Sequence, residues 1–384
     1  MTSTHTLDTL LLILRDSAIA RDKQGGHAAQ EKQLLREAGL LACAIPTIHG
    51  GDGRSWHDTL AIIRRIATVD SALAHLVAFH ALQVATVLIF GSDTQKHKWL
   101  DRSSRENGWW GNALNPLDRR LDARRVEGGY VLNGAKRFCS GATGSSYLTI
   151  SADYAPTGEV LLFVADTQQA GIRVLDDWNA IGQRQTDSGT VEFTNVFVPT
   201  EDVLRGEGFA PQPWHSVRAP VAQLILVNLY AGIAAGALEE ARRYSLEKAR
   251  PWLFSDVQQA SEDPYRLLRI GEMHVHSATA AVMADRGAQL LDQSWQQGLA
   301  LSAVQRQETA LAVAEAKVIA HRASLYNGQA LFDAAGASAA HAGLGLDRFW
   351  RNARTHTLHD PLDYKLRALG DWELTGSMPV NLYS

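Results

Sequence analysis

Residues 130–136 read YVLNGAK, and this stretch decides the fold class because it places β structure in the middle of an otherwise helical chain. Tyr130-Val131-Leu132 favours a strand, and Asn133-Gly134 is the dipeptide most typical of a hairpin turn. We therefore expect a hairpin-like turn there, with Arg137-Phe138-Cys139 on its far side. The sequence predicts further strands at 147–151, 160–165, 172–175 and 190–197, the last of them ended by Pro199. Residues 109–210 are accordingly predicted to form an antiparallel β-domain.

The segment before this β-domain, residues 1–108, is predicted to be an α-helical domain. The leucines between Leu7 and Leu14 recur at helical spacing, and so do the apolar residues of 60–66. Ser92-Asp93-Thr94-Gln95 has the pattern of a capping box, which marks the start of a helix. One helix is therefore expected to end near Phe90, and the next to begin at Asp93.

The segment after the β-domain, residues 211–384, is predicted to form a C-terminal four-helix bundle. Long alanine-rich stretches cover 221–249, 265–297 and 301–332, and small residues suit closely packed helices. A linker at 250–264 separates the first two stretches. Helices followed by strands and then by helices do not match the βαβ alternation of doubly wound folds, so we expect an α+β multi-domain architecture.

The bulk composition limits the classes of function. Of 384 residues, 46% are hydrophobic and 20% charged, which supports buried cores rather than disorder. The 37 basic and 41 acidic residues leave a net charge of -4, so neither nucleic acid nor an anionic membrane is an expected partner. Two cysteines, Cys43 and Cys139, cannot form a disulfide framework. Residues 1–6 lack the start of a signal peptide, and we expect a soluble cytoplasmic protein.

Several common motifs are missing from the sequence. It has no glycine-rich phosphate fingerprint after a strand, no P-loop and no serine elbow of the hydrolase type. A nicotinamide site of the Rossmann kind is therefore not expected. His356 and His359 could form half of a metal site, but zinc needs further ligands in a tetrahedral set, so no metal is expected.

Short motifs that run almost end to end resemble the acyl-CoA dehydrogenase superfamily. They are, in chain order, the stretches 90–96 with Trp99-Leu100, 130–136, 181–186, 191–193 and 351–354. The resemblance implies a flavin held between the β-domain and the helical bundle. It also implies a homotetramer in which a neighbouring subunit completes each site.

Two departures from the dehydrogenase pattern bear on the reaction. Acyl-CoA dehydrogenases carry a Glu-Gly pair whose glutamate removes a proton from the substrate, and the matching stretch here is His359-Asp360-Pro361. The shorter Asp360 and the rigid Pro361 would misplace such a base. Residues 112–118 lack the family's Gly-Ser-Asp turn. Both departures, together with the stretch 354–361, resemble the flavin monooxygenase branch, dibenzothiophene monooxygenase in particular.

Membership of that branch would imply a two-component flavin-dependent monooxygenase. Such an enzyme takes reduced FMN, with FAD as the alternative, from a separate flavin reductase. It then uses O2, through a C4a-hydroperoxyflavin, to oxygenate a small substrate, which we expect to be aromatic or an organosulfur compound. The alternatives are an FAD-dependent acyl-CoA dehydrogenase and a helical scaffold that has lost its flavin.

The resemblance also names residues expected to act in catalysis. Ser140, just after Phe138-Cys139, stands where the family places a hydroxyl that bonds the flavin. His359 is the expected proton carrier, and His356 would orient it from the same face of a helix that stops before Pro361. His80 and Asn112 are expected to shape the pocket for O2 and substrate. The plain alternative for His80 is a core histidine bonded to a backbone carbonyl.

Further residues are expected to hold the flavin itself. Phe138 and Asn112 would lie beside it with Ser140, and Trp178 would lie where the β-domain wraps the isoalloxazine ring. Arg250 would meet a flavin phosphate across a subunit boundary, although a cation before Pro251 could equally cap a helix C-terminus.

Overall fold

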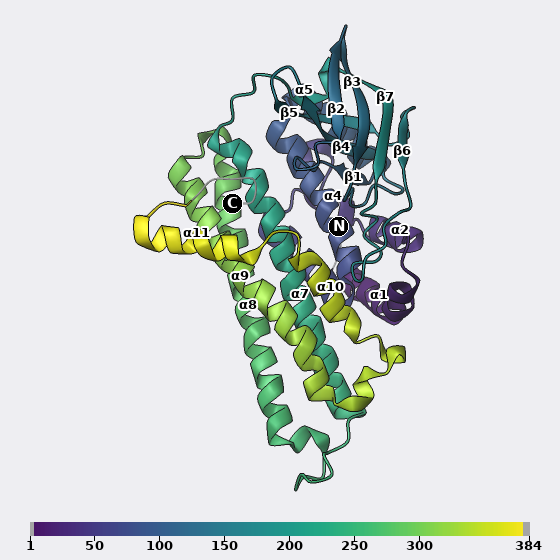
Figure 1. Ribbon diagram of the computed structural model, residues 1–384, viewed down its shortest axis with the longest axis vertical. Helices are drawn as coiled ribbons and strands as arrows, with labels where there is room; N and C mark the ends of the chain where they lie inside the picture. Colours follow the sequence, from purple (N-terminus) through teal and green to yellow (C-terminus); the bar gives the residue numbers. More distant parts are fainter. Residues whose placement is uncertain (1–3, 379–384) are drawn as a thin grey trace.

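The computed structural model describes residues 4–378 and shows helical, sheet and helical segments in chain order (Figure 1). Residues 1–3 of the N-terminal segment and residues 379–384 lie outside the described part. The N-terminal helices are α1 (Thr4–Gln24), α2 (Ala29–Glu37), α3 (Trp56–Val69), α4 (Ser71–Phe90), α5 (Asp93–Lys96) and α6 (Arg102–Glu106), with short turns η1 (Leu40–Ala42) and η2 (Thr47–His49) and a π-helical turn η3 (His97–Asp101). The expected break after Phe90 is confirmed, because Ser92 and Gln95 form the capping box.

Eight strands form one sheet in the middle of the described chain. They are β1 (Trp110–Ala113), β2 (Leu121–Val126), β3 (Gly129–Lys136), β4 (Tyr147–Tyr154), β5 (Glu159–Asp166), β6 (Ile172–Val174), β7 (Val191–Pro199) and β8 (Val203–Arg205). The order is β6-β7-β3-β2-β4-β5-β8, and β1 pairs with β4. The pairing is mostly antiparallel as predicted, but β4 pairs in parallel with both β1 and β2.

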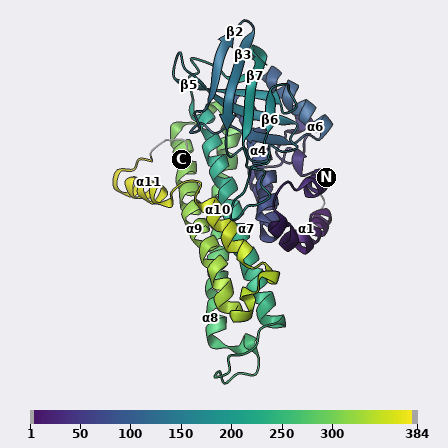
Figure 2. The ribbon, with the colours of Figure 1, turned by 45° about the vertical axis from the view of Figure 1, so that its right-hand side comes forward.

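The C-terminal segment is a bundle of four helices with a fifth beside it. The turn η5 (Pro213–Val217) leads into α7 (Arg218–Glu247), which packs with α8 (Pro264–Gln297), α9 (Ala303–Ala335) and α10 (Asp347–Thr357); α11 (Leu362–Thr375) packs on α9. Both views place the sheet at one end of the molecule and the α7–α8 linker at the other (Figure 1, Figure 2). The predicted α+β fold class is confirmed.

Five separate hydrophobic clusters form the core of the described chain. The largest is shared by the N-terminal helices and the bundle, since residues of α3, α4, α7 and α9 pack into it, whereas the sheet has its own. Two helical segments, Ser71–Phe90 and Pro213–Glu247, are long and apolar enough to cross a membrane, but 83% of the apolar window is buried in each. Their apolar length is thus explained by core packing.

The expected turn at Asn133-Gly134 is wrong. Both residues lie inside β3, and the β2–β3 hairpin turns instead at Glu127-Gly128, between the paired Val126 and Gly129. Gly134 has φ +132°, and a Cβ there would lie 2.0 Å from the carbonyl oxygen of Arg120. The register of β3 against β7 shifts at this point, so the glycine serves a β-bulge. Residues 137–139, expected as a strand, form a loop.

Candidate active site between the sheet and two helices

A chain of hydroxyl groups surrounds Ser140 in the loop after β3. The Ser140 Oγ lies 2.9 Å from the Ser188 Oγ, which lies 2.8 Å from the Thr186 Oγ1, and Thr186 donates to the carbonyl of Gln183. Ser140 is buried rather than exposed to solvent. A hydroxyl in such a chain can donate or accept according to what it meets, which suits hydrogen bonding to a bound ring.

Asn112 contacts this serine directly, and Phe138 and Trp178 contact each other beside the same two loops. The backbone N–H of Asn112 donates to the carbonyl of Ser140 at 3.0 Å. Phe138 is 61% exposed, and its ring meets the edge of Trp178 with 6.1 Å between centroids. The Trp178 Nε1 donates to the carbonyl of Gln183. An exposed Phe138 and a half-buried Trp178 thus stand beside the hydroxyl chain.

The backbone is strained at the same place. Five non-glycine residues of the described chain have positive φ, and three of them, Phe138, Gln183 and Asp187, lie in the two loops of this site. The other two are asparagines; asparagine and aspartate tolerate the left-handed region better than other residues, so the strain falls chiefly on Phe138 and Gln183. Strain of this kind costs about 1–3 kcal/mol per residue and gathers at functional sites. Its clustering marks these loops as the site.

Gln183 joins the β-domain to two helices. Its backbone N–H donates to the Asn352 Oδ1 on α10 at 2.7 Å, and its side-chain amide donates to the Ser71 Oγ on α4 at 3.0 Å. His75 and His356 each lie one turn further along these helices, because both are four residues on from the bonded side chain. Their rings meet edge to face with centroids 4.8 Å apart.

Buried polar atoms are left without partners in this region. Among the described residues, neither ring nitrogen of His75 has a hydrogen-bond partner, nor do the His356 Nδ1 and the Gln183 Oε1. Burial lowers the pKa of His75 to about 3 and that of His356 well below its usual range. Unsatisfied buried groups cost about 1–3 kcal/mol each, so a ligand with a polar edge, such as a flavin, fits this arrangement.

His359 lies differently from the sequence prediction. Helix α10 ends at Thr357, so His356 and His359 do not share a helical face. His356 is buried, whereas the His359 side chain is 42% exposed and its Nδ1 lies 3.0 Å from the Asp360 Oδ1. That carboxylate also accepts a hydrogen bond from the Lys317 Nζ at 3.0 Å, in an ion pair that is almost wholly buried.

The structure bonds the His80 ring to the backbone on both sides. Its Nε2 lies 2.9 Å from the carbonyl of Leu41, and its Nδ1 accepts a hydrogen bond from the Trp110 N–H. Both ring nitrogens are therefore engaged with the backbone, which matches the plain alternative of a core histidine. Arg250 lies exposed in the α7–α8 linker, at the end of the bundle opposite the sheet (Figure 1).

Sequence reasoning missed several residues that build the site. His75, Lys317 and Gln183 were not singled out, and Asp360 was considered only as a displaced base. Lys32 was also missed: its buried ammonium donates to the carbonyl of Thr143 at 2.5 Å and lies 3.4 Å from the carboxylate of Asp187. Helix α2 thereby fixes both loops. Of the residues that the sequence did signal, Asn112 and Ser140 are joined by a backbone hydrogen bond, and His356 contacts His75.

A helical domain, a mostly antiparallel sheet and a helical bundle, with a strained site at their junction, define the acyl-CoA dehydrogenase class of flavoprotein fold. Three family models match the chain: the acyl-CoA dehydrogenase N-terminal domain at residues 14–107, the middle domain at 111–196 and the C-terminal domain at 224–364.

Individual relatives narrow the class further. The chain is 43% identical to a probable FMNH2-dependent monooxygenase, SfnC of Pseudomonas putida, over 95% of this chain and 92% of the relative. The solved structure of methanesulfinate monooxygenase MsuC from Pseudomonas fluorescens is 43% identical, with a TM-score of 0.97 and 99% of both chains covered. TdsC from Paenibacillus sp. A11-2, a dibenzothiophene monooxygenase solved with FMN and indole, is 35% identical, with a TM-score of 0.94 over 99% of this chain and all of that one. The chain belongs to the acyl-CoA dehydrogenase family and, within it, to the branch of flavin-dependent monooxygenases.

Proposed function

We propose that the chain is the oxygenase component of a two-component system, which receives reduced FMN from a separate flavin reductase and transfers one oxygen atom of O2 to a small organosulfur substrate. Relatives named as methanesulfinate and dibenzothiophene monooxygenases support the sulfur chemistry. The indole held by TdsC favours an aromatic compound as the second class to test. FMN is the flavin that accompanies these relatives.

One observation argues against dehydrogenation. Asp360 occupies the place where dehydrogenases of the family carry their base. Burial alone would raise its pKa, but the hydrogen bond from His359 and the charge of Lys317 hold that pKa well below the ordinary carboxyl range. A carboxylate with so low a pKa, held by two donors, is a poor acceptor for a proton from carbon. Its role here is to fix Lys317 and His359.

Each residue of the candidate site has a distinct role in the proposed reaction. The Ser140 hydroxyl, with Asn112 on its carbonyl, would meet the polar edge of the flavin, and Phe138 and Trp178 would flank the ring. Bound reduced FMN supplies the electrons for the reaction with O2. His75 and His356, neutral and buried, would accept or donate hydrogen bonds without carrying charge. His359, which reaches solvent, would carry the proton, while His80, bonded to the Trp110 N–H, would hold the strand that carries Asn112.

The experiment that tests this function follows the oxygen atom. The purified chain is supplied with reduced FMN and 18O2, together with methanesulfinate in one sample and indole in another. We expect the sulfur product to carry one 18O atom, as mass spectrometry will measure. Butyryl-CoA with FAD, mixed without air, is the matched control for the dehydrogenase alternative. Bleaching of the FAD by butyryl-CoA without 18O incorporation in either sample would overturn the proposal.

We propose further that the functional form is a homotetramer. Leu268, Val275 and Val282 recur every seven residues on the outer face of α8 and are 59%, 62% and 66% exposed. Trp252, Leu253 and Phe254 are exposed in the linker that carries Arg250. Exposed apolar side chains that recur along one helix face in this way are typical of a protein interface. The hollow beside Trp178, which Thr143, Arg184 and Asp187 also line, is too small to hold a flavin, which supports completion of the site by a second copy.

The stripe on α8 gives a test of the assembly. Replacing Val275 and Val282 together with glutamate buries like charges in the proposed interface, so we expect the tetramer to dissociate. Light scattering after size exclusion measures the mass. The control is Leu374→Glu on α11, which is 87% exposed outside the stripe. A tetramer that survives the double change would contradict this interface.

A cytoplasmic location is part of the proposal, since Cys43 and Cys139 are buried free thiols.

A further inference from the structure

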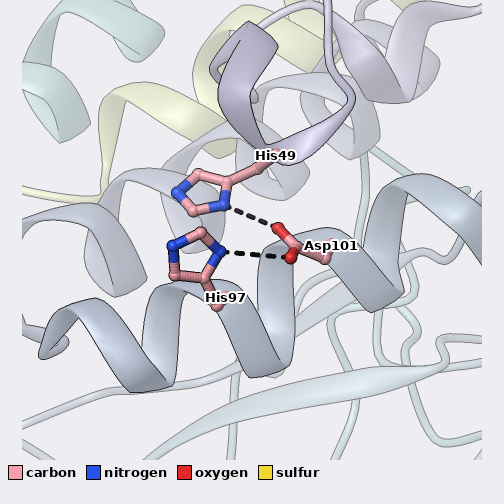
Figure 3. A group of neighbouring side chains, drawn as sticks. All are labelled: His49, His97 and Asp101. Carbon is pink, nitrogen blue, oxygen red and sulfur yellow. Dashed lines mark hydrogen bonds and ion pairs between the residues drawn. The ribbon is translucent and has the colours of Figure 1, made fainter.

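Two histidines and one carboxylate meet on the N-terminal domain, in a group that the proposed monooxygenase reaction does not use. His49 ends the turn η2, and His97 and Asp101 are the first and last residues of the π-helical turn η3. The His49 Nδ1 lies 2.6 Å from one oxygen of Asp101, and the His97 Nδ1 lies 3.2 Å from the other (Figure 3). One ligand atom from each residue can be chosen so that all three lie within 4.8 Å of one another.

From this juxtaposition we propose that His49, His97 and Asp101 form a binding site for a divalent transition metal, with Zn²⁺ as the best match. Zinc in proteins takes imidazole nitrogen at about 2.0–2.1 Å and carboxylate oxygen at about 2.0–2.2 Å in a tetrahedron. Ligand atoms around such an ion are about 3.4 Å apart, as those bond lengths require. The observed separations between the ligand atoms of the three residues lie on both sides of 3.4 Å, from 2.6 Å to at most 4.8 Å. Small side-chain movements would therefore complete the coordination.

The spacing of the two ligands on η3 supports the assignment. His97 and Asp101 are four residues apart, which brings both side chains to one face of a helical turn, as in metal-binding helices that carry two ligands at this interval. The turn itself is π-helical, and π-helical segments, which occur mostly as single turns next to α-helices, are frequent at functional sites. The local sequence of η3 thus brings two of the three ligands, His97 and Asp101, to the same face of the turn.

The third ligand is held in place by a rigid loop. Gly50, next to His49, has φ +81°, and a Cβ there would lie 3.2 Å from the Ser104 Cβ on α6. The N–H of Gly51 donates to the carbonyl of Pro46, and the N–H of Gly53 donates to that of Ile45. These bonds hold the loop together internally, the close approach of Gly50 to Ser104 sets it beside α6, and His49 is only 7% exposed. A preorganised ligand loses little freedom when the ion binds.

The donor set decides between classes of metal. Two imidazoles and one carboxylate suit zinc and neighbouring transition metals, whereas Mg²⁺ and Ca²⁺ prefer all-oxygen ligands. His97 and Asp101 are half exposed on their side chains, at 55% and 41%, so an ion can enter and a water molecule can take the fourth position.

The bound ion would fasten η2 to η3. Trp99 and Leu100 of η3 are buried in a core that also contains Trp110 and Tyr147 of the first and fourth strands. Holding the outer face of η3 therefore stabilises the junction between the N-terminal domain and the sheet. The expected role of the ion is structural, because this core, rather than the flavin site, lies behind it.

The test measures metal binding and needs no enzyme activity. Tag-free protein, treated with a chelator and dialysed, is titrated with ZnCl2 by calorimetry, and we expect one Zn²⁺ per chain and a rise in the melting temperature. Co²⁺ in place of Zn²⁺ should give the visible absorption bands of a tetrahedral site.

Variants separate this site from incidental binding. His97→Ala and Asp101→Asn should each weaken Zn²⁺ binding by at least about tenfold, the lower limit found for lost metal-supporting contacts. The control is His274→Ala, an exposed histidine on α8, which should bind Zn²⁺ unchanged. Circular dichroism confirms that each variant is folded. Equal affinity in wild type and His97→Ala, or equal losses in His97→Ala and His274→Ala, would overturn the proposal. Either result would leave the monooxygenase assignment untouched, because that rests on 18O incorporation.

Discussion

Replacement of His359 by alanine is expected to lower the yield of oxygenated product by about 10²–10⁴-fold, the usual contribution of a positioned proton donor or acceptor. His359 differs from the neighbouring histidines in its exposure to solvent. His75 and His356 are buried, and their pKa values, about 3 and well below the usual range, prevent them from holding a proton near neutral pH. His359 is 42% exposed, and the carboxylate of Asp360 orients its Nδ1, so it can exchange a proton with water.

The readout distinguishes lost chemistry from lost binding. Reduced FMN is mixed with O2 and substrate, and both product and hydrogen peroxide are measured. In His359→Ala we expect the consumed O2 to appear as peroxide, while titration of reduced FMN gives an affinity close to wild type. His341→Ala, a histidine in the exposed connection before α10, is the matched control. A normal product yield in His359→Ala would remove this residue from the proposed mechanism.

The order of structural segments was predictable because its signals are local. Alanine-rich helices without interior proline need only their own sequence, and the Ser92 capping box is complete within four residues. The turn expected at Asn133-Gly134 failed for a non-local reason. Strand β3 is paired on both sides, with β2 and with β7, and the glycine is needed where the carbonyl of Arg120 approaches. Tertiary packing thus overrode a strong local turn preference.

The candidate site was predictable only in part, because several of its residues are far apart in the sequence and meet only in the folded chain. His75 and His80 both lie in the apolar helix α4, and the sequence alone cannot tell which faces the site. That choice follows from Gln183, which ties Ser71 to Asn352 and so brings His75 against His356. His49 and the pair His97 and Asp101 likewise come together only when the loop at 46–53 folds onto η3.

The same dependence on distant partners explains the structure around Asp360. The carboxylate lies 43 residues from Lys317 along the chain, yet the two form an ion pair with side chains 5% and 1% exposed. Burial lowers the pKa of Lys317, and Asp360 opposes that change. Asp360 also contacts the Nδ1 of His359. The ion pair between Asp360 and Lys317 therefore supports both the local packing and the orientation of His359, the proposed proton carrier.

Replacing Asp360 with alanine should therefore destabilise the protein by about 3–5 kcal/mol, since removal of one partner leaves a buried charge uncompensated. Replacing both residues, as Lys317→Met with Asp360→Leu, should recover much of that loss because no buried charge remains. Urea denaturation at pH 7 measures the difference, with Glu373→Ala, an exposed acid on α11, as the control. Equal stability of Asp360→Ala and wild type would contradict the role given to this pair.

The pH dependence of the same variants gives an independent check. The folded-state pKa of Asp360 lies below its unfolded value of about 3.9, so its contribution is fully present above that unfolded value and is lost as the pH falls through the folded pKa. Wild type should therefore lose stability on acidification below about pH 4 more steeply than the double variant, which lacks this carboxylate. Thermal melts between neutral and acidic pH will measure the slopes. Parallel slopes in the two proteins would show that Asp360 is not held ionised by Lys317 and His359, and the orientation proposed for His359 would then lose its support.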